Sequence, residues 1–186
     1  MSRKFFQIGF NKCGTTFIAR LFQMNGYRAV HWAEGALAED IAFSKLAGRK
    51  PLQPWADTTV AFTDMESVRF LNMPVIEGFR DFALLDRHYP GSVFLLNTRR
   101  VEDWIASRYL HRGGAYARSI AANLGVSLGD LGDIWARDWA DHLSAVAYLG
   151  ERLGAPTGIG ERVAAVQGIW AEVYNLPGLR AEGRGH

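Results

Sequence analysis

Residues 5 to 18 read Phe5-Phe6-Gln7-Ile8-Gly9-Phe10-Asn11-Lys12-Cys13-Gly14-Thr15-Thr16-Phe17-Ile18 and set the organisation of the chain. An apolar run ends at a glycine and a short polar loop. Apolar residues then return with helical spacing at Phe17, Ile18, Leu21 and Phe22. This change of period predicts a strand, a loop and a helix.

The loop between this strand and helix has the residues of an anion site. Backbone N–H groups and the positive end of the helix dipole meet there with Lys12 and two threonine hydroxyls, which favours phosphate. The spacing is close to the Walker A pattern GxxxxGK[ST], with Gly9 and Gly14 as its glycines and Thr16 as its hydroxyl residue. However, Thr15 stands where the lysine should be, and Lys12 comes two residues before the second glycine. We therefore expect the loop to hold phosphate differently from a Walker loop.

The bulk composition is that of an ordinary globular chain. With 186 residues, 48% of them hydrophobic and 22% charged, it is long enough for one domain with a real core. The net charge of +2 gives no argument for a nucleic-acid partner, and no apolar run approaches the roughly 20 residues that span a membrane. The single cysteine excludes an internal disulfide, and Asn11 and Lys12 interrupt the apolar start too early for a signal peptide. These features predict a cytoplasmic protein.

Beyond the first helix, strands and helices alternate. The patterns predict helices at Gly14–Met24, Glu34–Ala47 and Val75–Tyr89, a helix that begins at Val101, and helices at Gly129–Leu153 and Glu161–Leu176. They predict strands at Tyr27–Trp32 and Thr58–Thr63, and a strand buried on both faces at Ser92–Thr98. The two prolines of Arg49–Pro54 predict a loop.

This alternation predicts an α/β fold in three layers, α/β/α, similar to P-loop NTPases. Its mainly parallel sheet has about four strands, and its carboxyl-terminal third is helical. We expect a single domain over residues 1–176 and a flexible tail over 177–186. Ligands of such sheets bind beyond the carboxyl ends of the strands. The polar clusters of the chain lie at these ends, namely Asn11 to Thr16, His31, Asp64 to Glu66, and Arg99-Arg100.

Two of these clusters resemble the sulfotransferases that use 3′-phosphoadenosine 5′-phosphosulfate. The nucleotide loop of that family reads lysine, a small residue, Gly-Thr-Thr and an aromatic residue, and this chain has Lys12-Cys13-Gly14-Thr15-Thr16-Phe17. The family also has an arginine leaving a buried strand and a serine eight positions later, as do Arg99 and Ser107. The segment from Asn97 to Arg108 is similar to the bacterial sulfotransferase-like branch, and the resemblance covers residues 5 to about 110.

The resemblance implies two anion sites, because the donor carries a 5′-phosphosulfate and a separate 3′-phosphate. The loop residues Asn11, Lys12, Cys13, Gly14, Thr15 and Thr16 would hold the 5′ end. Lys12 would also stabilise charge on the bridging oxygen. Arg99 and Ser107 would hold the 3′-phosphate, and Phe17 would stack on adenine. The reaction would release 3′-phosphoadenosine 5′-phosphate and need no metal.

The acceptor would be a hydroxyl or amine of a small molecule or sugar, and it must lose a proton to a base. The resemblance favours Glu66, then Asp64, with His31 as a third candidate. Other roles stay open for these residues. His31 also fits a structural residue at a strand end, Asp64 fits a helix cap, and Phe17 fits the core.

Cys13 raises another possibility, because a thiol at a helix N-terminus has a lowered pKa and can act as a nucleophile. Cysteine phosphatases need an arginine six positions after the cysteine, whereas here Ala19 occupies that position and Arg20 follows one residue late. The sequence favours a small packing residue at Cys13.

Three functions remain in order of preference. The first is a sulfotransferase. The second is a binding module that keeps the fold without turnover, because residues 153–160 lack a strand-forming run and residues 180–185 only faintly resemble a closing basic loop. The third is an ATP-dependent small-molecule kinase, which the displaced lysine disfavours.

Overall fold

The computed structural model describes residues 3–69 and 74–152, and these form an α/β fold around a four-stranded parallel sheet. The predicted last helix at 161–176, the tail at 177–186 and the segment 153–160 lie outside the described residues. In chain order, the elements are β1 (Phe5–Gln7), α1 (Thr15–Met24), β2 (Ala29–His31), the 3₁₀ turn η1 (Ala33–Gly35), α2 (Ala36–Ala47), α3 (Gln53–Ala56), β3 (Ala61–Thr63), β4 (Glu66–Ser67), β5 (Ile76–Glu77), the 3₁₀ turn η2 (Gly78–Arg80), α4 (Phe82–His88), β6 (Val93–Leu95), α5 (Val101–Leu110), α6 (Ala115–Leu124) and α7 (Leu131–Arg152).

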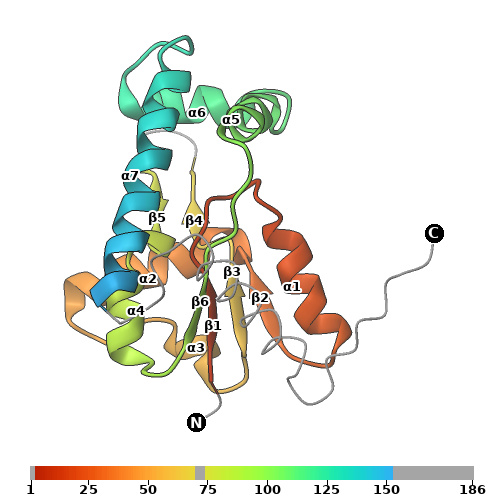
Figure 1. Cartoon of the computed structure of the whole chain (residues 1–186), viewed down its shortest axis with the longest axis vertical. Helices are drawn as coiled ribbons and strands as arrows, with labels where there is room; N and C mark the ends of the chain where they lie inside the picture. Colours follow the sequence, from red (N-terminus) through yellow and green to blue (C-terminus); the bar gives the residue numbers. More distant parts are fainter. Residues whose placement is uncertain (1–2, 70–73, 153–186) are drawn as a thin grey trace.

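The strands of the main sheet are ordered β2-β3-β1-β6, and all of them run parallel (Figure 1). Phe6 of β1 pairs with Phe62 of β3 on one side and with Phe94 of β6 on the other. The first crossover, through α1, leads to β2 at one edge, and β6 lies beyond β1 at the other. The connection that leaves β1 therefore runs toward the β2 edge, whereas the connection that leaves β3 runs toward the β6 edge. Ligands of such sheets bind beyond the carboxyl ends of the strands.

Hydrophobic cores lie on both faces of this sheet, because successive residues of β1 point to opposite sides. On one face, the Phe5 ring packs 5.0 Å from the Phe22 ring of α1. On the other, Phe6 belongs to a larger core with residues of α2, α4 and α7, among them Leu37, Leu85 and Trp139. Helices thus cover both faces of the parallel sheet, as burial of its apolar strands requires.

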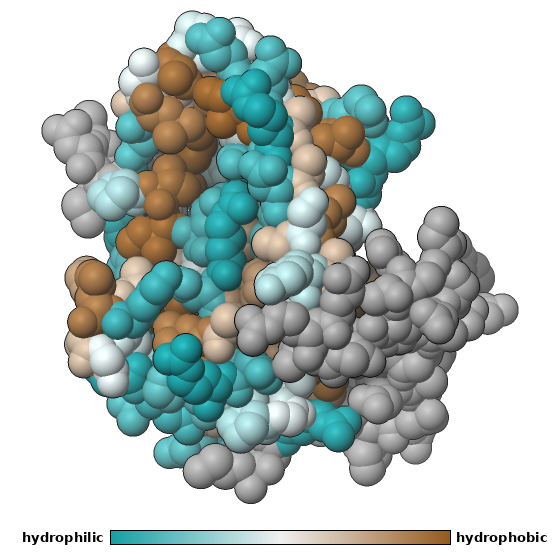
Figure 2. Space-filling view, turned by 60° about the vertical axis from the view of Figure 1, so that its left-hand side comes forward, coloured by the Kyte–Doolittle hydropathy of each residue, from teal (hydrophilic) through white to brown (hydrophobic). Residues whose placement is uncertain are grey.

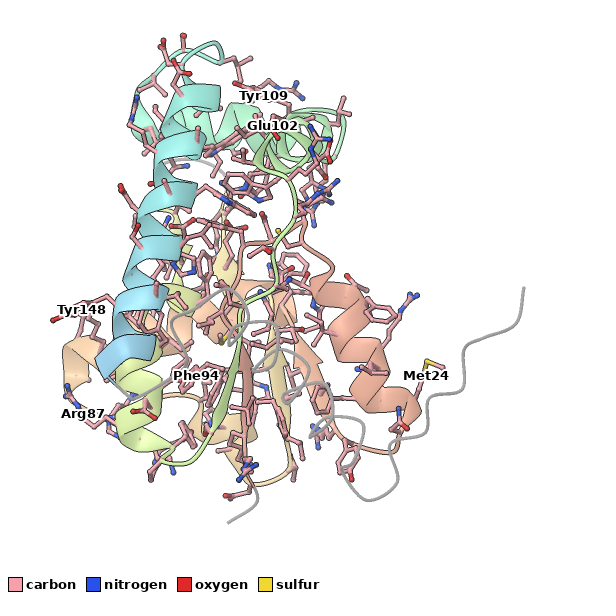
Figure 3. All side chains as sticks on the ribbon, in the orientation of Figure 1. Met24, Arg87, Phe94, Glu102, Tyr109 and Tyr148 are labelled. Atoms are coloured by element: carbon pink, nitrogen blue, oxygen red, sulfur yellow. The ribbon has the colours of Figure 1, made fainter. Side chains whose placement is uncertain are left out.

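Helices α5 and α6 lie across the carboxyl edge of the sheet (Figure 1). In Figure 3, Glu102 and Tyr109 mark α5 above that edge, Phe94 marks β6 within the sheet, and side chains fill the space between them. The surface in Figure 2 mixes hydrophobic and hydrophilic areas. No helix in the described ranges combines the length and apolarity needed to cross a bilayer.

The long helix α7 is tied directly to the end of β1. His142 donates from Nε2 to the carbonyl oxygen of Ile8 at 2.6 Å, and its ring lies against Phe10 and Phe79 at 5.0 and 5.2 Å between centroids. Burial lowers the pKa of His142, because a charged ring among these aromatic residues would lose its hydration. The neutral ring therefore fixes the strand end from which the polar loop departs.

The helix predicted over Val75–Tyr89 is only partly correct. Residues Ile76–Glu77 form β5 and pair antiparallel with β4, and the α-helix begins at Phe82. The apolar spacing of Ile76 and Phe79 fits a helix, but Gly78 packs so closely on α2 that an added Cβ would lie 3.0 Å from the Cα of Ala38. Tertiary packing therefore overrides the local pattern.

Three other predictions need correction. The strand at Ser92–Thr98 is shorter, Val93–Leu95, and it is half-buried at an edge of the sheet as described rather than buried on both faces. Residues Ala115–Leu124 form α6, although no element was predicted between the helix from Val101 and the helix at Gly129–Leu153. The prolines of the predicted loop do not exclude a helix, because Pro54 occupies the first turn of α3, where its missing N–H costs nothing.

Candidate functional site

The polar loop after β1 is braced by the end of β6. Gln7 donates from Nε2 to the Oδ1 atom of Asn97 at 2.6 Å, and Asn97 donates from Nδ2 to the carbonyl oxygen of Cys13 at 2.7 Å. Gly9 permits this approach, since an added Cβ would lie 2.3 Å from the backbone oxygen of Asn97. The first glycine of the motif is thus required by close packing against β6.

The second half of the loop turns sharply into α1. Gly14 has a φ of 88° and Lys12 a φ of 63°, so two residues within three adopt the left-handed region. For lysine this conformation is strained, and such strain often marks a functional site. No side chain of the described residues caps the N-terminus of α1. Its first N–H groups are therefore available to an anion.

A cavity of about 500 Å³ opens at this loop, beyond the carboxyl ends of the strands. Its volume is within the roughly 300–1,000 Å³ of small-molecule sites. The lining residues come from several segments between Asn11 and Ser119 and are mainly polar. They are Asn11, Lys12, Gly14, Thr15, Thr16, His31, Trp32, Asp64, Glu66, Val68, Arg99, Ser107, His111, Arg112, Tyr116 and Ser119.

Both predicted anion elements line this one cavity. Arg99, at the carboxyl end of β6, donates from Nη1 to the backbone oxygen of Lys12 at 3.1 Å. Ser107, two turns along α5, faces the same space, and its hydroxyl makes no hydrogen bond within residues 3–69 and 74–152. Two of the predicted residues do not line the cavity. Cys13 contributes its backbone to the loop, and the side chain of Phe17 is 62% exposed elsewhere.

Cationic side chains stand on the open side of the cavity. Lys12 donates from Nζ to Nδ1 of His111 at 3.3 Å. Burial lowers the pKa of His111, and the charges of Lys12 and Arg112 lower it further, so the neutral ring accepts this hydrogen bond. We call Lys12, Thr16, Arg99, Ser107 and Arg112 the open face. Its three cations favour an anionic ligand.

A second group of residues closes the inner side of the cavity, and we call it the buried network: Asn11, Glu66, Arg108 and Tyr116. Arg108 donates from Nη2 to Oε1 of Glu66 at 2.9 Å and from Nε to Oδ1 of Asn11 at 3.1 Å. The Tyr116 hydroxyl donates to the same Oε1 at 2.9 Å, and Nδ2 of Asn11 donates to Oε2 at 2.5 Å. Both oxygens of Glu66 are therefore occupied.

The buried network fixes the start of the polar loop. The Arg108 guanidinium is 2% exposed and lies 4.4 Å from the Trp104 ring and 5.1 Å from the Trp135 ring. Trp104 donates from Nε1 to the carbonyl oxygen of Asn11 at 3.0 Å. Residues of α5 therefore bind both the side chain and the backbone of Asn11, and the same helix carries Ser107. The two anion elements are connected through this helix.

Burial raises the pKa of Glu66 to about 7, although the nearby Arg108 charge acts in the opposite direction. Glu77 contributes to the rise, because it lies directly opposite Glu66 in the β4–β5 pair. Arg108 lies close to both carboxylates, with its Nη2 atom 3.8 Å from Oε1 of Glu77. This arrangement balances two acids that would otherwise repel each other across the strands.

Asp64 lies at the carboxyl end of β3 in a different environment. Its Oδ2 is 3.6 Å from Nε2 of His31, which is also 3.2 Å from Oγ1 of Thr16. Burial raises the pKa of Asp64, and the charges of His31 and Lys12 partly oppose this. Asp64 does not cap a helix, since β4 follows it, its φ is 56°, and its N–H donates to Oε1 of Gln7.

The thiol of Cys13 is not activated. Burial raises its pKa to about 11, and the charges of Arg99 and Arg108 only partly oppose this. The expected effect of the helix N-terminus is outweighed by desolvation, because the side chain packs against the larger core. Cys13 is therefore a protonated packing residue at neutral pH.

Several site residues were not singled out from the sequence. Arg108 and Tyr116 lie in segments that show a solvated or linker pattern, and only the fold reveals their burial. His111, Arg112 and Trp32 surround the cavity without a motif. One signal was present for the last of these, because Trp32 directly follows His31 at the end of a predicted strand.

The described residues contain no group of three or more His, Cys, Asp or Glu side chains that could hold a metal ion. Comparisons of the chain with protein-family models, with curated proteins and with solved structures found no match.

Proposed function

We propose that this protein is a sulfotransferase that uses 3′-phosphoadenosine 5′-phosphosulfate. The observation that carries the proposal is that Arg99 and Ser107 line the same cavity as the Lys12–Thr16 loop. A single phosphate loop would serve many nucleotides, whereas two separate anion elements suit a nucleotide with phosphate groups at both its 5′ and 3′ positions. The P-loop relationship of the fold is part of this proposal.

In this proposal, the N-terminus of α1 with Lys12 and Thr16 binds the 5′-phosphosulfate. Arg99 and Ser107 bind the 3′-phosphate through charge-assisted hydrogen bonds. Lys12 stabilises the negative charge that develops on the oxygen between phosphorus and sulfur. The strained backbone of Lys12 and its contact with His111 position this ammonium at the cavity.

The geometry favours Asp64 over Glu66 as the base, because both oxygens of Glu66 already accept hydrogen bonds. Asp64 takes the proton from the acceptor's hydroxyl or amine, and His31 stabilises the carboxylate beforehand. The acceptor atom forms a bond to sulfur while the bond from sulfur to the bridging oxygen breaks. The product 3′-phosphoadenosine 5′-phosphate leaves with that electron pair, and the sulfated acceptor carries the SO₃ group.

The test is calorimetry with three nucleotides. We expect 3′-phosphoadenosine 5′-phosphate to bind more tightly than either AMP or ATP. Arg99→Ala should weaken binding of the 3′-phosphorylated nucleotide by about 10- to 100-fold and leave AMP unchanged, because only the former has a 3′-phosphate. Arg100→Ala is the matched control, since Arg100 is 80% exposed in its side chain and does not line the cavity. Tighter binding of ATP, or equal effects of the two arginine variants, would contradict the proposal.

A non-catalytic binding module is the alternative. It predicts the same nucleotide binding without transfer of labelled sulfate to any acceptor in a broad screen. Transfer that is lost in Asp64→Asn, with nucleotide affinity retained, would exclude this alternative.

A further inference from the structure

Trp32 and Arg112 line the cavity and have no role in the donor site proposed above. Trp32 follows β2, whereas Arg112 follows α5, and the guanidinium carbon of Arg112 lies 5.3 Å from the centre of the Trp32 ring. Two segments 80 positions apart therefore meet over the cavity through one cation–π contact.

The backbone at both segments is strained. Trp32, Ala33 and Glu34 have φ values of 60°, 48° and 56°, and Arg112 has a φ of 52°. A positive φ is unfavourable for a non-glycine residue, so three in a row persist only where the surroundings impose them. Lys12 and Asp64, which also line the cavity, share this conformation. The strain is thus concentrated around one space.

A shallow hollow of about 390 Å³ continues outward from this point. It is lined by Trp32, Glu34, Ser67, Val68 and Arg69, and it shares Trp32 and Val68 with the main cavity. Trp32 directly follows His31, whose Nε2 atom lies 3.6 Å from Oδ2 of Asp64. A molecule that approaches Asp64 from this hollow passes the Trp32 ring.

The charges along this route are unequal. Arg69 is neutralised, because it donates from both Nε and Nη2 to the carboxylate of Glu39. Arg112 makes no hydrogen bond or ion pair within the described ranges, and its side chain is exposed. Glu34 stands in the outer hollow, so an acidic group is favoured at Arg112 in the main cavity and disfavoured farther out.

From these observations, we propose that Trp32, Val68 and Arg112 form the acceptor subsite and that it takes a ring-containing acceptor with an acidic group. The ring packs on Trp32 and Val68, and the carboxylate or similar acid accepts charge-assisted hydrogen bonds from Arg112. This places the acceptor's hydroxyl or amine toward the His31–Asp64 pair. The inference rests on the sulfotransferase proposal for the identity of the reaction, but not for the preference for acids.

The experiment uses matched ligands that differ in the acid alone. The first pair is 4-hydroxyphenylacetate and 2-(4-hydroxyphenyl)ethanol, and the second is 4-nitrophenyl β-D-glucuronide and 4-nitrophenyl β-D-glucoside. Each is titrated into the full chain with and without saturating 3′-phosphoadenosine 5′-phosphate. We expect the acid of at least one pair to bind about tenfold more tightly than its neutral partner.

Variants then assign this preference to residues. Arg112→Ala should reduce the preference to less than about twofold while the affinity for 3′-phosphoadenosine 5′-phosphate stays unchanged. Trp32→Ala should weaken both members of a pair by a similar factor, because the ring contact is common to them. Arg137→Ala removes an exposed arginine that does not line either space and should change nothing.

Two results would overturn the inference. One is equal binding of acid and neutral ligands in both pairs. The other is a loss of nucleotide affinity in Arg112→Ala as large as that in Arg99→Ala, which would assign Arg112 to the donor. If the nucleotide fails to bind but the acid preference persists and depends on Arg112, then the subsite stands and the sulfotransferase proposal fails.

Discussion

The buried network and the open face border the same cavity but satisfy their polar groups in opposite ways. In the buried network, Glu66 accepts hydrogen bonds from three different side chains, and Arg108 is enclosed by aromatic rings. On the open face, Ser107 and Arg112 have no hydrogen-bond partner within the described ranges. The first group is built to hold the loop, and the second is available to a ligand. Substitutions in the two groups should therefore affect different measurements.

The largest expected effect comes from breaking the buried ion pair. Arg108→Met should lower the free energy of unfolding by about 3–5 kcal/mol at pH 8. Glu66 loses its ion-pair partner and must either stay buried without a counter-charge or take up a proton, and Asn11 loses a hydrogen bond. Urea denaturation followed by tryptophan fluorescence measures this. Arg100→Met, at an exposed position, should change the same free energy by less than about 0.5 kcal/mol. Adding Glu66→Gln to Arg108→Met should restore part of the loss, and equal effects of the two single variants would refute the distinction.

A similar loss, but in function alone, is expected on the open face. Lys12→Ala should reduce the proposed sulfuryl transfer by about 10²- to 10³-fold, since it removes one preorganised charge beside the reacting group. Its midpoint of urea denaturation should stay close to that of the unmodified protein, because Lys12 is only half-buried. A lower midpoint of urea denaturation in this variant would mean that the open face also stabilises the fold.

The third prediction concerns pH and the buried carboxylate. The pKa of Glu66 is raised to about 7 in the folded protein, so the folded state holds a proton that the unfolded state releases near pH 4.5. This contribution to stability is complete below about pH 4.5 and is lost as the pH rises to about 7. We expect Glu66→Gln to remove about 1–3 kcal/mol of this decline. Parallel stability curves for both proteins between pH 5 and pH 8 would rule out a raised pKa.

The smallest effect is expected at Cys13, which belongs to the loop but lies between the two groups. Because the thiol pKa is raised to about 11, iodoacetamide should modify it much more slowly than free cysteine at pH 7.5. Cys13→Ala should leave nucleotide affinity within about twofold, since the loop uses the Cys13 backbone. Rapid alkylation together with inactivation would restore the nucleophile hypothesis.

The open face was largely predictable from sequence, whereas only Asn11 and Glu66 of the buried network were predicted, as a residue of the donor loop and as a base. Local patterns identify a strand, a glycine loop and a helix, and the family resemblance pairs Arg99, after a predicted strand, with Ser107 eight positions later. Arg108 directly follows Ser107, yet the sequence pattern of an arginine among polar helix residues is that of a solvent-exposed arginine. Its burial depends on Trp135 and Tyr116, whose helices pack over it only in the folded chain.

Contacts between distant segments also explain the errors in the predicted fold. The segment before α4 has helical spacing, but pairing with β4 and contact with α2 make it extended. Helix α6 follows two glycines, and this punctuation concealed it. Local sequence patterns predicted the secondary structure correctly where a segment's conformation depends on nearby residues. They failed where contacts with distant segments determine the conformation.

The hydrogen bond from His142 to Ile8 has a consequence for the order in which the protein becomes competent. Ile8 leaves the ribosome before its partner His142, which is synthesised 134 positions later. Until α7 docks, the Ile8 carbonyl lacks this bond, and the strand end from which the polar loop departs is not fixed. Contacts of such separation form late because a long loop must close first. Nascent chains that end before residue 142 therefore contain every residue of the polar loop but lack the His142 bond that fixes the preceding strand end.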